Sequence, residues 1–159
     1  AIPFHRLCTG GATRFESVRN GLAALGPCDL IAVHDGVRPL VSSALIRTCI
    51  ATAAAHGSAI PAVRPADSFR TVDASGNRII DRDTLRAIQT PQIFRADLLR
   101  AAYRQPGRPS FTDDASVVEA AGTPVTLCEG EKYNIKITTP EDLALARLLV
   151  EAGLVQTQN

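Results

Sequence analysis

Residues 34–39, His-Asp-Gly-Val-Arg-Pro, place an acid, a glycine and an arginine close together in the chain. They follow the apolar run 30–33, which is too short for a helix and predicts a buried strand whose carboxyl end enters a polar turn. In open α/β sheets, ligands bind at the carboxyl ends of strands. Asp35, Gly36 and Arg38 could therefore hold a charged ligand, although a solvated turn with an Asp cap would have the same pattern.

A second stretch with chemical potential is the glycine turn at residues 9–13, Thr-Gly-Gly-Ala-Thr. Adjacent glycines before a helix let backbone N–H groups approach a ligand closely, although an ordinary helix entry is the simpler interpretation. Thr13 and Glu16 have the spacing of a capping box. The helix that follows has an apolar face at three- and four-residue steps, and Gly26-Pro27 ends it.

Residues 67–82 have the pattern of a β-hairpin, with a turn at Asp-Ala-Ser-Gly, 73–76. A hairpin with so few apolar residues would be marginal alone, so we expect it to pack on something, and a second subunit is a reasonable candidate. Five arginines lie in or near this segment. They form either a solvated basic arm or a set from which some hold a phosphate. They are Arg64, Arg70, Arg78, Arg82 and Arg86.

Two further sites lie in the second half of the chain. Thr112 is the expected N-cap of a helix, and Asp113 and Asp114 favour its dipole; paired carboxylates can also bind Mg²⁺, but capping is the preferred interpretation. Residues 133–138 predict a final strand on which Lys136 points to the polar face. Such a lysine is usually solvated and matters only if that face borders a ligand cleft.

Strand and helix patterns alternate along most of the chain, which predicts one α/β layered domain, residues 1–159, on a mainly parallel sheet with a hairpin arm at 67–82. Pro61, inside a strand at 58–63, argues for an edge position or a bulge. Further helices are expected from Ser42 or Ser43 to residue 56, over residues 96–103, from the Thr112 cap to Gly122, and from Thr139 onward. Further strands are expected at 93–94 and 125–128.

Composition excludes several classes of protein. Of 159 residues, 45% are apolar and 21% charged, which is typical of a globular domain; the net charge of +1 gives no support for nucleic-acid binding. No apolar run is long enough for a membrane span. The four cysteines lack zinc-site spacing, and we expect Cys49 and Cys128 to be buried thiols of a cytoplasmic protein. Because the chain contains no Met, we expect that part of the protein precedes it.

Taken in order, six motifs closely resemble the 2-C-methyl-D-erythritol 4-phosphate cytidylyltransferase family over essentially the whole chain. They are Gly-Gly at 10–11 with Arg14 and Ser17-Val18, the hexapeptide 34–39, Asp67-Ser68, Thr-Pro-Gln at 90–92, Thr-Asp-Asp-Ala-Ser at 112–116, and Asn-Ile-Lys-Ile-Thr at 134–138 with Pro-Glu-Asp-Leu at 140–143. One motif would be weak evidence, whereas six in the family's order are specific.

The resemblance implies a three-layer, Rossmann-like nucleotidyltransferase domain that uses CTP and a divalent cation such as Mg²⁺, with unknown metal ligands. The methylerythritol phosphate would attack the α-phosphorus of CTP in line, giving cytidine-diphosphate methylerythritol and pyrophosphate for non-mevalonate isoprenoid biosynthesis. Because two anions must meet, catalysis should rest on cations and positioning. The family's N-terminal strand and glycine-rich triphosphate loop have no counterpart here, so this chain alone is expected to have little activity.

The resemblance also implies roles for individual residues and a homodimer formed through the hairpin arm. Members of the family commonly have Asp where this chain has Ala12, and Thr where it has Ser68. The implied set comprises Gly11, Ala12 and Ser17 against cytosine and ribose, Asp35, Gly36 and Arg38 at the junction of the substrates, Lys136 on phosphate, and Ser68 and Arg82, with Thr90 nearby, on the acceptor phosphate across the dimer.

Two alternatives remain open. A cytidylyltransferase for another polyol phosphate, such as ribitol 5-phosphate, would share the cytidine side and differ around Ser68, Arg82 and Thr90. A non-catalytic dimerising fragment would have no need to keep four residues together, namely Asp35, Arg38, Arg82 and Lys136.

Overall fold

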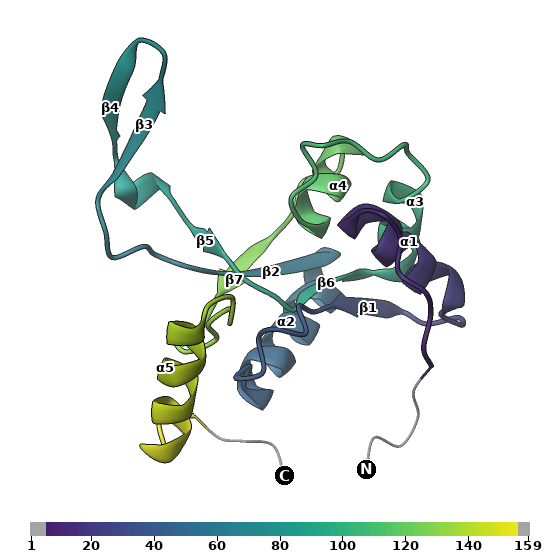
Figure 1. Ribbon diagram of the computed structural model, residues 1–159. Coiled ribbons are helices and arrows are strands. Elements are labelled where there is room, and N and C mark those ends of the chain that lie inside the picture. Colours follow the sequence, from purple (N-terminus) through teal and green to yellow (C-terminus); the bar gives the residue numbers. More distant parts are fainter. Residues whose placement is uncertain (1–5, 156–159) are drawn as a thin grey trace.

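The computed structural model describes residues 6–155, which fold as an α/β domain with an extended hairpin (Figure 1). The helices are α1 (Arg14–Ala24), α2 (Ser43–His56), α3 (Ala96–Ala102), α4 (Asp114–Ala120), α5 (Pro140–Glu151) and the short 3₁₀ helix η1 (Arg82–Thr84). The strands are β1 (Leu30–Val33), β2 (Ser58–Val63), β3 (Phe69–Asp73), β4 (Gly76–Ile80), β5 (Ala87–Ile88), β6 (Gln92–Arg95) and β7 (Leu127–Glu129).

The main sheet is mixed, which corrects the prediction of a mainly parallel sheet. Its order is β1-β6-β2-β5, with β7 beside β2. Strand β6 runs antiparallel to both β1 and β2, β5 runs antiparallel to β2, and only the β2–β7 pair is parallel. The physical reason is the connection between β2 and β6. It contains a hairpin and no crossover helix of the kind that parallel neighbours require.

Pro61 lies in the central strand β2, so the predicted edge position is wrong. The carbonyl of Pro61 accepts a hydrogen bond from the N–H of Gln89 at 2.8 Å. Along this side of β2, pairing with β6 ends at Ala59 and pairing with β5 begins at Ala62. The missing N–H of Pro61 therefore falls where the neighbouring chain is interrupted, and the proline removes no ladder bond.

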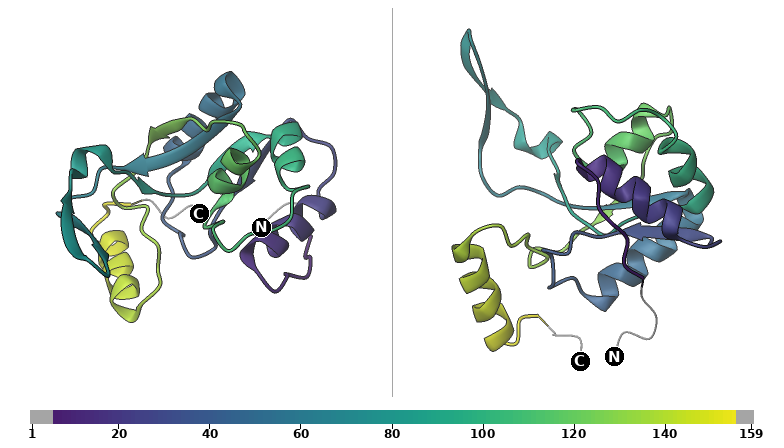
Figure 2. Two further views of the ribbon diagram at one scale, coloured as in Figure 1. Left: turned by 90° about the horizontal axis from the view of Figure 1, so that it is seen from above. Right: turned by 45° about the vertical axis from the view of Figure 1, so that its right-hand side comes forward.

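Helices cover both faces of the sheet, as the three-layer expectation required (Figure 2). Adjacent residues of β6 alternate between the two layers: Phe94 packs with Phe15 of α1 and Leu99 of α3, whereas Ile93 packs with Cys49 of α2. A third cluster places Ala146 and Leu149 of α5 against Leu40, just after the hexapeptide. Helix α5 thus packs against the segment that follows the hexapeptide.

The helix starts follow local capping chemistry. Thr13 and Glu16 form the predicted capping box of α1, Ser42 caps α2, and Thr139 caps α5. The predicted cap of α4 at Thr112 is wrong by one residue. Asp113 accepts a hydrogen bond from the N–H of Ser116 at 2.9 Å, because a carboxylate that also binds Gln92 can satisfy both partners there.

Strands β3 and β4 pair over five residues each and form a sheet of their own that stands away from the domain (Figures 1 and 2). The hairpin prediction is therefore confirmed as a local structure. Its apolar side chains are exposed, with Val72 at 80% and Ile79 at 72%. None of the helices within residues 6–155 has the length and apolar character that crossing a bilayer requires.

The predicted strand at 133–138 is wrong, because this segment forms no strand. It turns at Glu131–Asn134 through a 3.1 Å hydrogen bond, and the N–H of Ile137 donates to the carbonyl of Val37 at 2.8 Å. The N–H of Asn134 is thus used in a turn and that of Ile137 in a bond to the hexapeptide, so neither pairs with a strand of the sheet. Lys136 consequently lies beside Asp35 without being on a strand.

Candidate active site

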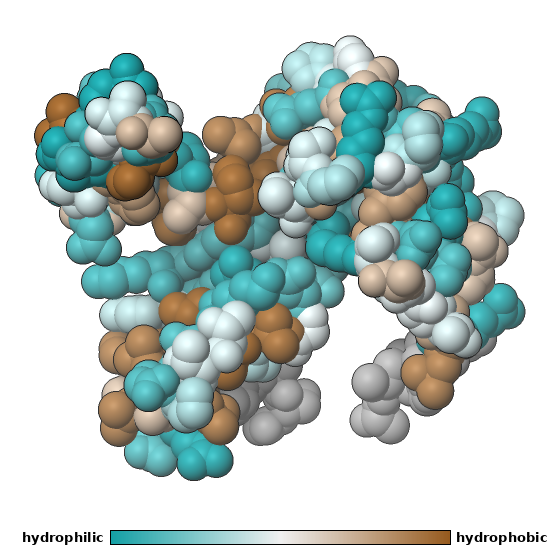
Figure 3. Space-filling model, turned by 45° about the horizontal axis from the view of Figure 1, so that its top comes forward, coloured by the Kyte–Doolittle hydropathy of each residue, from teal (hydrophilic) through white to brown (hydrophobic). Residues whose placement is uncertain are grey.

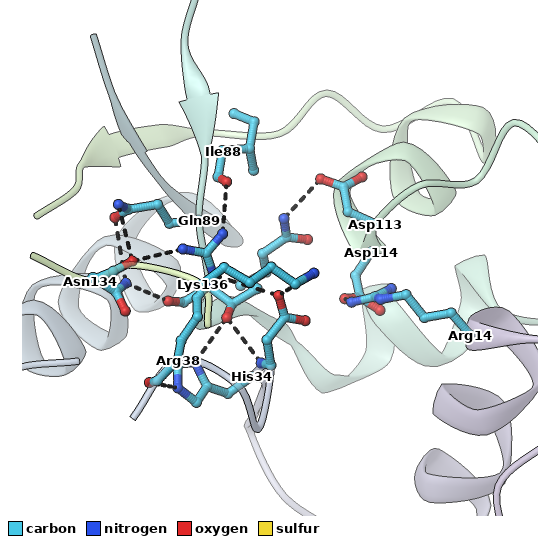
Figure 4. Close-up of polar contacts among 12 residues, drawn as sticks. Arg14, His34, Arg38, Ile88, Gln89, Asp113, Asp114, Asn134 and Lys136 are labelled. Carbon is cyan, nitrogen blue, oxygen red and sulfur yellow. Dashed lines mark hydrogen bonds and ion pairs between the residues drawn. The ribbon is translucent and has the colours of Figure 1, made fainter. Parts of the chain in front are cut away.

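An ion pair links the hexapeptide to the segment before α5 (Figure 4). The Nζ atom of Lys136 lies 3.2 Å from Oδ2 of Asp35, and the side chains are 49% and 18% exposed. Lysine has three N–H donors, so its ammonium group can bind this carboxylate and still donate to another oxygen. The structure therefore brings two sequence-predicted site residues together, with the lysine facing solvent.

The Arg38 side chain connects the segments that carry this ion pair. Its Nη1 donates to the carbonyl of Asn134 at 2.7 Å and its Nη2 to that of Ile88 at 3.5 Å, while Nε lies 3.5 Å from Oδ2 of Asp35. The side chain is only 11% exposed. Its charge therefore faces Asp35, but its donors are directed mainly at backbone carbonyls.

The hydroxyl of Thr90 is also committed inside the protein. It accepts a hydrogen bond from the N–H of Asp35 at 3.0 Å and lies 2.9 Å from Nδ1 of His34. Thr90 is 4% exposed. The structure thus places this predicted substrate-binding residue directly under the hexapeptide of its own chain.

Sequence reasoning missed two buried amides, Gln89 and Asn134, and the imidazole of His34. The Gln89 amide donates to the carbonyl of Glu131 at 2.8 Å and accepts from its N–H at 3.1 Å. The Asn134 amide donates to the carbonyl of Thr90 at 2.8 Å. His34 and Asn134 belong to motifs that the sequence offered and Gln89 precedes one, but the roles of the two amides could not be predicted because their partners lie more than 40 positions away.

The glycine turn is ordered by Ser17. The Ser17 hydroxyl accepts from the N–H of Gly11 and donates to the carbonyl of Thr13, both at 2.9 Å. A β-carbon on Gly11 would come within 2.2 Å of the β-carbon of Glu16, so only glycine fits there. Ala12 is exposed on the same turn. The three predicted cytidine contacts, Gly11, Ala12 and Ser17, therefore form one local unit.

The paired carboxylates at the start of α4, Asp113 and Asp114, are engaged within the fold. Asp114 is fully buried, where it accepts from Nη2 of Arg14 at 2.6 Å and from the Tyr103 hydroxyl at 2.5 Å. Burial and the neighbouring Asp114 charge raise the pKa of Tyr103 far above its usual value. Burial tends to lower the pKa of Arg14, but its hydrogen bond and charge interaction with Asp114 outweigh this and raise it.

The remaining predicted residues lie at the base of the hairpin. Ser68 immediately precedes β3 and is exposed, and Arg82 begins η1, where it donates to the carbonyl of Ala66 at 2.8 Å. The hairpin stands away from the sheet (Figure 2), and within residues 6–155 no hydrogen bond or ion pair joins Ser68 or Arg82 to Asp35 or Lys136. Gly36 lies beside Asp35 in the exposed turn, with open space where a side chain would be.

Comparisons with known proteins place this chain in a family. The model of the 2-C-methyl-D-erythritol 4-phosphate cytidylyltransferase family matches residues 3–152. The enzyme of that name from Bacteroides fragilis is 47% identical over 146 residues, covering 92% of this chain and 67% of the relative. That from Porphyromonas gingivalis is 50% identical over 147 residues, covering 92% and 66%. The chain belongs to this family.

Solved structures agree with that assignment. The crystal structure of 2-C-methyl-D-erythritol 4-phosphate cytidylyltransferase from Thermus thermophilus superposes with a TM-score of 0.79 at 38% identity, covering 89% of this chain and 71% of that one. The 4-diphosphocytidyl-2C-methyl-D-erythritol synthase from Anaerococcus prevotii gives 0.80 at 33% identity, covering 89% and 66%. The chain spans about two thirds of the length of the curated relatives it matches.

The cytidylyltransferase family consists of CTP-dependent transferases that form cytidine-diphosphate methylerythritol for isoprenoid biosynthesis. The described residues contain no cluster of three or more His, Cys, Asp or Glu side chains able to hold a metal ion. Asp35, which is partly exposed, is a carboxylate able to take one position on a cation. That arrangement fits Mg²⁺, which is commonly bound by one or two carboxylates together with substrate phosphates and water.

Proposed function

We propose that this chain carries the transfer site of a cytidylyltransferase that joins CTP to 2-C-methyl-D-erythritol 4-phosphate. The observation that carries this proposal is the contact of Lys136 with Asp35 at the carboxyl end of β1. An exposed ammonium group at this edge of the sheet can stabilise phosphate charge in the transition state. The same edge is where ligands bind in open α/β sheets.

In this mechanism an oxygen of the acceptor phosphate attacks the α-phosphorus of CTP in line, the bond between the α-phosphorus and the oxygen of the β-phosphate breaks, and pyrophosphate leaves. Asp35 orients the Lys136 ammonium group, whose remaining N–H donors bind the phosphate oxygens as charge accumulates. Arg38 contacts both Asp35 and the segment of Lys136 and so fixes their relative position. Gly36 leaves room for the substrates at their junction. Bound Mg²⁺ would shield the triphosphate charge and polarise the α-phosphorus.

The cytidine would lie against the glycine turn. Gly11 is exposed on this turn with its N–H bound by Ser17, and Ala12 offers a small apolar contact in place of the Asp common in the family. Loss of that carboxylate would remove one contact to the nucleoside.

The acceptor phosphate would be held by Ser68 and Arg82 from the partner subunit of a homodimer. Exposed apolar side chains on the hairpin support this assembly, because Phe69, Val72 and Ile79 would otherwise remain in water. Figure 3 shows such residues on the hairpin and on α5, where Leu148 is 61% exposed. All cysteines in the described part of the chain are free thiols, which supports a cytoplasmic location.

The test is an acceptor assay on the complete gene product that contains this chain. Pyrophosphate release with CTP, Mg²⁺ and 2-C-methyl-D-erythritol 4-phosphate should greatly exceed that with ribitol 5-phosphate. Comparable or greater turnover of ribitol 5-phosphate would instead support the second acceptor. Absence of CTP binding would support the non-catalytic fragment and overturn the proposal.

A variant separates the acceptor contact from the nucleotide site. Arg82→Ala should raise the KM for the acceptor phosphate roughly 10- to 100-fold, the loss expected for a charge-assisted hydrogen bond, with little change in CTP binding. Arg104→Ala, at an exposed position after α3, is the matched control. Equal losses for both substrates would contradict the assignment of Arg82.

A further inference from the structure

The two charged groups at the centre of the site are both carried by irregular backbone. Asp35 lies in the turn after β1, and Lys136 lies in the segment between β7 and α5. No helix or sheet ladder fixes either residue. Their 3.2 Å separation must therefore depend on hydrogen bonds. Some of these bonds join the two segments directly, and others are made by Gln89 and Thr90, between β5 and β6.

The direction of each hydrogen bond around Thr90 follows from its chemistry. Nε2 of His34 lies 3.0 Å from the carbonyl of Arg38, which can only accept, so Nε2 carries the ring proton. In the neutral ring Nδ1 is then an acceptor, and the Thr90 hydroxyl donates to it. The same hydroxyl accepts from the N–H of Asp35. A directed chain thus runs from Asp35 through Thr90 and His34 to the carbonyl of Arg38.

Thr90 also reaches the other half of the ion pair. Its carbonyl accepts from the Asn134 amide at 2.8 Å, two residues before Lys136. Asn134 is fully buried and its carbonyl accepts from Arg38. The side chain and the backbone of one residue therefore bind the segments of Asp35 and Lys136 respectively.

We propose that Thr90 and His34 are positioning residues that act through Asp35, so that the Thr90 hydroxyl orders the ion pair of its own subunit and does not bind the acceptor phosphate. This inference rests on the proposed function of the Asp35–Lys136 site. It adds His34 to the residues needed for the reaction. It also reassigns Thr90 from a direct contact with substrate to an indirect one.

The first test is independent of activity. In protein labelled with ¹⁵N at histidine, nitrogen–proton correlation spectra at neutral ring charge should show His34 protonated at Nε2, with Nδ1 accepting a hydrogen bond. Thr90→Val, which keeps the shape and removes the hydroxyl, should shift the Nδ1 signal, whereas Thr90→Ser should not. Thr48→Val, at an exposed position on α2, is the control. An Nδ1-protonated ring, or an unchanged signal in Thr90→Val, would overturn the inference.

The second test is a double-mutant cycle in the complete gene product. Thr90→Val should lower kcat roughly 3- to 10-fold, Thr90→Ser should restore it, and the KM for the acceptor should change little. In an Asp35→Asn background the Thr90→Val loss should largely disappear, because the hydroxyl acts through Asp35. An additive loss, or one confined to the acceptor KM, would identify a direct substrate contact. An inactive wild type would contradict the proposed function but leave the spectroscopic result intact.

Discussion

The buried Asp114 provides the sharpest test of how this fold is held together. The carboxylate is inaccessible to solvent and binds Arg14 at 2.6 Å and Tyr103 at 2.5 Å. Each hydrogen bond to a charged group contributes about 1.5–3 kcal/mol, and Arg14, whose side chain is 35% exposed, recovers part of its loss by binding water. Asp114→Ala should therefore cost about 3–5 kcal/mol, the range found when one partner of a buried pair is removed.

The assay is urea unfolding followed by circular dichroism. With a slope of about 2 kcal/mol per M, the midpoint for Asp114→Ala should fall by about 1.5–2.5 M. Asp114→Asn, which keeps an acceptor for Arg14, should lose about half as much and covers the case in which the alanine variant does not fold. Asp97→Ala, which breaks an exposed pair with Arg95, is the control. A shift for Asp114→Ala no larger than that of the control would refute the reasoning.

Three further outcomes follow from local chemistry. Gly11→Ala should destabilise the protein by about 1–3 kcal/mol in urea melts, because the added β-carbon would overlap Glu16. Gly21→Ala should stabilise it by about 0.5–1 kcal/mol, because Gly21 lies within α1 and its added β-carbon would meet no other atom. Hydrogen bonds from the backbone N–H groups of Thr138 and Thr139 lower the pKa of Asp142. The ionised carboxylate therefore stabilises the fold above its unfolded-state pKa of about 4, and this stabilisation is lost as the pH falls through the lower pKa of the folded state. In acid titrations, the difference in stability between wild type and Asp142→Ala should vanish at low pH. Burial raises the pKa of Cys49 to about 12, so mass spectrometry should find it unmodified by iodoacetamide at pH 8 while the exposed Cys8 reacts.

Local signals predicted most of the elements correctly. The capping box at Thr13, the Ser42 cap and the hairpin all depend on residues within a few positions of one another, and the structure contains each of them. Sheet direction could not be predicted in the same way. It depends on whether the chain between two strands crosses over the sheet or turns back beside it. The chain between β2 and β6 turns back, so that these strands pair antiparallel, but the long hairpin between them hid this from the sequence pattern.

The candidate site was predicted in part, for the same reason. Asp35 was selected as an acid at the carboxyl end of a predicted strand and Lys136 as a cation for phosphate. The two side chains lie 3.2 Å apart, but the expected strand under Lys136 does not exist. Gln89 and Asn134 carry no charge and have no helical or strand periodicity that would mark them. Their function comes from partners 42 and 44 positions away, which only the folded chain brings together.

Neutral amides are well suited to hold this site together. Arg38 already brings one nearly buried charge to within 3.5 Å of Asp35, and the amides add donors and acceptors without adding net charge. Gln89 uses both groups on the backbone of Glu131 and so imitates a strand neighbour where no strand exists. The charged pair can then remain partly exposed to its substrates, because Arg38, the buried amides and the Thr90 hydroxyl supply the order that regular secondary structure would otherwise provide.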